Sequence, residues 1–83
     1  MTKKKLIAAG NTVVPALLTL EQLGFTITGA PDQCIAARGD EVYAADDPVT
    51  VLGLVKLVET RSWNWRASDA DIENILSKYH LNG

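Results

Sequence analysis

Residues 34–45 read Cys-Ile-Ala-Ala-Arg-Gly-Asp-Glu-Val-Tyr-Ala-Ala, and this stretch decides the fold. Two apolar runs flank Gly39-Asp40, and two residues of this type between apolar runs are typical of a tight hairpin loop. Opposite charges on Arg38 and Glu41 at the mouth of the loop favour this register. Counting outward from the loop predicts five cross-strand pairs: Arg38–Glu41, Ala37–Val42, Ala36–Tyr43, Ile35–Ala44 and Cys34–Ala45.

This register divides the hairpin side chains between two faces, because successive residues of a strand point to opposite sides. We expect the first face to meet the core, and it carries Ile35, Ala37, Val42 and Ala44. We expect the second face to be covered by the N-terminal segment or exposed to a partner, and it carries Cys34, Ala36, Tyr43 and Ala45.

Outside the hairpin, the patterns predict one more strand and three helices. Alternation predicts a strand at 25–28. Apolar residues at helical spacing predict a helix at 13–23, capped by Asn11 or Thr12 and ended by a left-handed Gly24. The segment 4–8 could add a further strand or a helical turn.

The other two helices follow the hairpin. Asp47-Pro48 is a strong start for a helix at 48–61, and this helix is apolar almost all round, as a central helix is. Ser68 opens a helix at 69–80, and its single apolar stripe consists of Ile72, Ile75, Leu76 and Tyr79.

We therefore predict an α+β fold in the order α-β-β-α-α. A small, mainly antiparallel three-stranded sheet (25–28, 34–38, 41–45) packs against three helices (13–23, 48–61, 69–80). The 83 residues are enough for one compact domain, 1–83, in which 1–5 form a flexible basic tail.

Charge is distributed unevenly along the chain. Eight basic and ten acidic residues give a formal net charge of −2. Lys3, Lys4 and Lys5 supply three of the positive charges, so residues 6–83 carry five basic and ten acidic residues, a net −5. An acidic body repels phosphate, which argues against nucleic-acid binding. No apolar run reaches the 18 residues that a membrane span requires.

The sequence offers little for catalysis. One cysteine, Cys34, and one histidine, His80, cannot form a structural zinc site, and a lone cysteine suits a reducing cytoplasm. We interpret Cys34 as a buried apolar residue and His80 as a complement to a helix dipole. Two pairs of acids are adjacent in the sequence, Asp46-Asp47 and Asp40-Glu41. We attribute the first pair to a helix start and the second to the hairpin. We therefore expect no enzyme activity, no catalytic residue, no metal and no cofactor.

The segment with partner-binding character is Arg61-Ser-Trp-Asn-Trp-Arg66. Trp and Arg are the residues most enriched in interface hot spots, and two of each fall within six residues here. We expect at least one of the tryptophans to fill the core. The predicted partner-binding residues are Arg61, Trp63, Trp65, Arg66, Tyr43, Asp40 and Glu41.

Three function classes follow from these features. The first is a non-enzymatic, acidic protein-binding module, an inhibitor or immunity-type antagonist that masks a basic partner; its composition is typical of small cytoplasmic bacterial adaptors. The second is a regulatory nucleic-acid-binding protein that uses Lys3–Lys5, Arg61 and Arg66. The third is a small-ligand binder around Cys34, Tyr43 and Trp65. A homodimer through the sheet edge or the second helix is compatible with each class.

Overall fold

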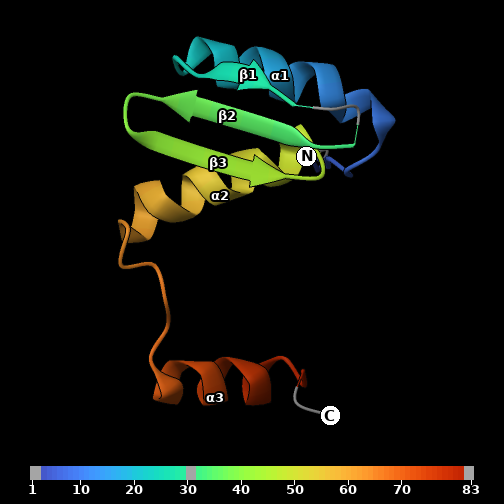
Figure 1. Ribbon diagram of the computed structural model, residues 1–83. Coiled ribbons are helices and arrows are strands. Elements are labelled where there is room, and N and C mark those ends of the chain that lie inside the picture. The colour runs from blue at the N-terminus through green and yellow to red at the C-terminus, as the bar shows by residue number, and fades with distance from the viewer. Residues whose placement is uncertain (1–2, 30–31, 82–83) are drawn as a thin grey trace.

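A computed structural model describes residues 3–29 and 32–81 (Figure 1). It confirms the α+β class and the three predicted strands. The element order is α-β-β-β-α-α, so the order predicted above has one strand too few. Residues 4–8 form neither a strand nor a helix. The elements are a 3-10 turn η1 (Gly10–Thr12), α1 (Val13–Gln22), β1 (Thr26–Thr28), β2 (Cys34–Arg38), β3 (Glu41–Ala45), α2 (Pro48–Arg61) and α3 (Asp69–Lys78).

The hairpin forms as its loop predicts. All five cross-strand pairs of β2 and β3 are confirmed, and β1 adds to the free side of β2, giving an antiparallel sheet in the order β1-β2-β3. Gly39 has a φ of 58°, a left-handed conformation that glycine adopts without steric cost. Arg38 and Glu41 close the hairpin with an Nε–Oε2 distance of 3.1 Å.

The predicted assignment of the two hairpin faces is wrong. The face that meets the core carries Cys34, Ala36 and Tyr43, which are buried, whereas Val42 on the opposite face is 60% exposed. The physical reason is Tyr43, whose ring offers more apolar area than any side chain of the other face and whose hydroxyl reaches a partner at the sheet edge. Ala36 beside it is 0% exposed, because its small side chain allows the helices to approach the sheet closely.

Two helices, α1 and α2, cover this buried face (Figure 1). Leu20 of α1 and Val51 and Val55 of α2 form the core with the sheet. Asp47 caps α2 as predicted, since its carboxylate accepts hydrogen bonds from the backbone N–H and the hydroxyl of Thr50 at 2.9 and 2.8 Å.

The start of α1 differs from the prediction. Thr12 makes no side-chain cap; its hydroxyl donates to the carbonyl of Ala9 at 2.7 Å, so the 3-10 turn takes the place of a cap. The end of α1 agrees with the prediction, because Gly24 adopts a φ of 93°.

The opposite face of the sheet is not covered by either helix. We call it the open sheet face; its side chains are Thr26, Thr28, Ile35, Ala37, Val42 and Ala44. None of these residues is charged, although antiparallel sheets commonly present polar side chains to water.

The last helix, α3, stands away from the sheet (Figure 1). Ser68 caps it as predicted, by accepting a hydrogen bond from the N–H of Asp71 at 3.1 Å. It ends two residues before the predicted boundary, because His80 adopts a φ of 57°. None of its residues is buried, so two of the three helices pack against the sheet rather than all three. In the described residues, no helix combines the length and apolar character needed to cross a bilayer.

Candidate functional site

The two tryptophans of the connection between α2 and α3 lie on the surface. Trp63 is 59% exposed and Trp65 is 40% exposed, so the expectation that one of them fills the core is wrong. Tyr43 already occupies the space between the sheet and α2, and the ring of Trp63 stacks on it with a centroid distance of 5.5 Å and an interplanar angle of 18°. Trp63 therefore keeps much of its indole surface available to a partner.

Both arginines of the connection hold Trp65 in place. The Nε of Arg61 donates a hydrogen bond to the Trp65 carbonyl at 2.9 Å, and the guanidinium of Arg66 lies 5.2 Å from the Trp65 ring centroid. A guanidinium at this distance is attracted by the negative face of an indole. Their charges are thus engaged within the connection.

The tryptophans border a groove of about 260 Å³ beside β3, which we call the Trp groove. Its lining residues come from β3, from α2 and from the connection between α2 and α3. Its lining residues are Val42, Tyr43, Ala44, Leu54, Leu57, Val58, Trp63 and Trp65.

The outer edge of β3 runs along this groove. In a two-residue hairpin, the pair that closes the loop is hydrogen-bonded and the bonding then alternates. Glu41, Tyr43 and Ala45 therefore bond to β2, while the backbone N–H and C=O groups of Val42 and Ala44 point away from the sheet. Within residues 3–29 and 32–81, no backbone group outside the hairpin bonds to those of Val42 or Ala44.

A small polar network holds the side chain of Tyr43, one of the residues that line the groove. The hydroxyl of Tyr43 donates to Oε1 of Glu41 at 2.9 Å, and Arg38 donates to the other carboxylate oxygen. Arg38 also donates to the carbonyl of Leu23 at 2.8 Å and lies 4.3 Å from the ring centroid of Phe25. Phe25 in turn meets Tyr43 edge to face at 5.7 Å. The network orients Tyr43, against which Trp63 stacks.

These contacts shift two pKa values in opposite directions. The hydrogen bonds from Arg38 and then Tyr43 lower the pKa of Glu41 below its ordinary 4.5. Burial, followed by the hydrogen bond to the Glu41 carboxylate, raises the pKa of Tyr43 above its ordinary 10.0. The network is therefore complete at neutral pH, where Glu41 is ionised and Tyr43 keeps its proton.

We expect acid to remove the stabilisation that Glu41 provides. A carboxyl group whose pKa is lowered on folding stabilises the protein above its unfolded pKa, and this contribution disappears as the pH falls through the folded pKa. Glu41→Gln should therefore be less stable than the wild type at pH 7, and the difference in urea midpoint should close below the ordinary Glu pKa of 4.5. An unchanged difference at pH 3 would contradict the assigned role of Glu41.

The remaining predicted site residues are less closely associated with the groove. Asp40 lies exposed in the hairpin loop and does not line the Trp groove. Lys3, Lys4 and Lys5 are exposed near the N-terminus, and residues 1–2 of the predicted basic tail lie outside the described residues. The α2 side chains Leu57 and Val58 were not predicted as site residues; the apolar character of this helix on nearly all sides was the signal for them.

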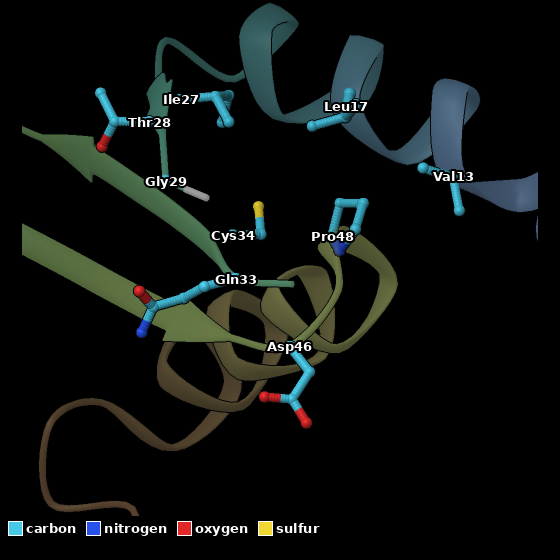
Figure 2. Close-up of a pocket in the computed structure, with 9 residues that line it drawn as sticks. All are labelled: Val13, Leu17, Ile27, Thr28, Gly29, Gln33, Cys34, Asp46 and Pro48. Atoms are coloured by element: carbon cyan, nitrogen blue, oxygen red, sulfur yellow. The ribbon is translucent and has the colours of Figure 1, made fainter. Parts of the chain in front are cut away.

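Cys34 lines a different hollow, of about 300 Å³, between α1, the end of β1 and the start of α2. Figure 2 shows its sulfur among Leu17, Ile27 and Pro48. Burial, followed by the nearby Asp47 carboxylate, raises the pKa of the Cys34 thiol, which disfavours the nucleophilic thiolate. Cys34 therefore does not share a pocket with Tyr43 and Trp65, as a ligand site around all three would require.

Across the described ranges 3–29 and 32–81, no three His, Cys, Asp or Glu side chains gather as metal ligands would. Comparison of the chain with protein-family models, with curated proteins and with solved structures finds no match.

Proposed function

We propose that this chain is a non-enzymatic protein-binding module that takes up an extended segment of a basic partner protein along β3. One observation carries the proposal: the unpaired edge of β3 runs beside a groove bordered by two exposed tryptophans. An edge strand next to a side-chain groove is the arrangement by which β-strand addition recognises peptides.

The edge of β3 supplies the hydrogen bonds. Val42 and Ala44 present backbone donors and acceptors, and no proline, bulge or outward charge protects this part of the strand. Proteins commonly protect an edge that must not pair. A partner strand would therefore bond to Val42 and Ala44 without disturbing the hairpin.

The tryptophans supply the anchoring contacts. Trp63 stacks on Tyr43 with one face, and its remaining exposed surface is a large apolar contact area that is already held in position. Trp65 is held by Arg61 and Arg66. Rigid aromatic side chains are favoured as interface anchors because binding them costs little conformational entropy.

Charge indicates the chemistry of the partner. The chain after Lys5 carries a net −5, and the three arginines nearest the groove are engaged with Glu41, with the Trp65 carbonyl and with the Trp65 ring. Glu59, whose charge acts on Tyr43, and Asp40 in the hairpin loop are exposed, and these acids favour lysine and arginine on the incoming segment. A module of this kind acts by covering its partner, as inhibitors and immunity-type antagonists do.

Selection from a random peptide library displayed on phage tests the proposal. We expect the full-length chain to enrich peptides that combine basic and apolar residues. Trp65→Ala should weaken binding of a selected peptide by about 30-fold or more, in line with a central aromatic anchor. Val42→Pro, which removes one outward N–H at an edge position that tolerates proline, should weaken it comparably.

A matched control separates the groove from the rest of the surface. Leu18→Ala alters an exposed apolar residue of α1 and should leave the peptide affinity unchanged. Thermal unfolding of each variant checks that it remains folded. If folded Trp65→Ala and Val42→Pro bind the selected peptides as tightly as the wild type, or if acidic peptides are enriched, the proposal is wrong.

A further inference from the structure

Two largely apolar surfaces remain uncovered, and one of them, the open sheet face, adjoins the Trp groove through Val42 and Ala44. The first is the open sheet face, which contains no charged side chain. The second is the stripe of α3 formed by Ile72, Ile75, Leu76 and Tyr79, of which three members are exposed and Leu76 is half-buried. Acidic residues flank this stripe at 69–73. This pattern is typical of a helix that packs its apolar face against a partner and exposes its polar face to water.

The exposed area of the chain is too large for a compact monomer. Its accessible surface is 6773 Å², whereas a compact chain of 83 residues exposes about 4,900 Å². Its radius of gyration is 15.5 Å, against about 12 Å for a compact domain of this length. The excess of about 1,900 Å² is more than twice the ~800 Å² that each partner contributes to a standard interface.

The two surfaces match in size and shape. Helix α3 has 10 residues and is about 15 Å long, and strands β2 and β3 have five residues each and are about 17 Å long. Ala37 and Ala44 leave the middle of the open sheet face shallow, and the large side chains of the stripe would fill it. Large side chains on small ones give the close packing that interfaces require.

The connection directs α3 away from its own sheet. Ser62 follows α2 with a φ of 60° and a ψ of −172°, which turns the chain away from the helix axis. Trp63 stacks on Tyr43, and Arg61 binds the Trp65 carbonyl. The chain from 61 to 65 is thus fixed on the body, and α3 projects from it (Figure 1). If α3 folded back onto the open sheet face of its own chain, these contacts would break. A second molecule is therefore the better candidate to cover the stripe of α3 and the open sheet face.

We propose that two copies of this chain form a reciprocal dimer in which α3 of each lies on the open sheet face of the other. Exchange of an identical element between protomers is an accessible route to a two-fold dimer. Each sheet would then be covered on both faces, by α1 and α2 of its own chain and by α3 of the second copy.

Sedimentation equilibrium of the full chain across a dilution series tests the dimer. We expect the wild type to show the dimer mass, and Ile75→Asp in the stripe and Ala37→Asp on the sheet to raise the dissociation constant by about 100-fold or more, because each buries two unpaired carboxylates per dimer. Val14→Asp, a matched change at an exposed valine of α1, should leave the dimer intact.

Mixing the two defective variants tests the reciprocal geometry. A heterodimer of Ile75→Asp with Ala37→Asp retains one intact helix on one intact sheet face, so the mixture should associate more tightly than either variant alone. Pairing of α3 with α3 predicts the opposite, since Ala37→Asp would then dimerise as the wild type does. Ala37→Lys provides a second sheet variant should Ala37→Asp fail to fold.

A wild type that remains monomeric throughout the series, whether α3 is free or folded onto its own sheet, overturns the proposal. So does an Ala37→Asp or Ala37→Lys variant that is folded and dimerises normally. Ala37 does not line the Trp groove, so peptide binding by these variants is measured separately. The dimer is argued without the peptide-binding proposal, although Val42 and Ala44 belong to both surfaces.

Discussion

Ala36→Asp is expected to leave the protein unfolded, while the same substitution one residue later, Ala37→Asp, leaves it folded. Ala36 is 0% exposed, against the buried side chains of α1 and α2, and an unpaired carboxylate there should cost about 3–5 kcal/mol or more. This is comparable to the whole stability of a small domain. Ala37 lies on the open sheet face, where the change should cost about 1 kcal/mol or less.

Urea unfolding followed by far-UV circular dichroism distinguishes the two variants, each measured at low protein concentration. The two alanines are neighbours in the same strand, so strand propensity and added charge are the same in both. A folded Ala36→Asp together with an unfolded Ala37→Asp would show that the opposite face of the hairpin forms the core.

Tyr43→Ala is expected to lower the free energy of unfolding by about 3–5 kcal/mol, as for other large aromatic residues removed from a core. The substitution removes the edge-to-face contact with Phe25 and the surface on which Trp63 stacks. Tyr43→Phe keeps the ring and removes only the donor to Glu41, so it should cost about 0.5–1.5 kcal/mol.

Near-UV circular dichroism of the folded variants tests the link to the binding site. We expect Tyr43→Phe to retain the signal of a stacked Trp63, and Tyr43→Ala, where still folded, to lose it. If Tyr43→Ala costs no more than Tyr43→Phe, Tyr43 is not the core residue that supports the Trp groove.

The hairpin could be predicted in full because its determinants are local. Gly39-Asp40 sets the length of the loop, and the pairing of Arg38 with Glu41 follows from it. The choice of the buried face could not be predicted in the same way, because neither face of the hairpin is clearly polar. That choice depends on the large ring of Tyr43 and on the side to which α2 returns, and the alternation of residues in β2 and β3 alone does not determine it.

The candidate site could be predicted in part. The Trp-rich connection and Tyr43 were both among the predicted partner-binding residues, but the sequence did not place them together; the structure brings Tyr43, Trp63 and Trp65 to one groove. The exposure of both tryptophans was missed, since a Trp between helices usually fills a core. The stripe of α3 indicated a packed helix, but a stripe does not show whether its partner lies in the same chain.

The most direct test of the binding account is amide hydrogen exchange, followed by NMR with and without a peptide selected from the library. We predict that the peptide slows exchange of the Val42 and Ala44 amides by about tenfold or more, because these are the outward N–H groups of β3. The Tyr43 amide, already bonded to β2, should change little by comparison. Bound peptide that leaves the exchange of Val42 and Ala44 unchanged would contradict strand addition at β3.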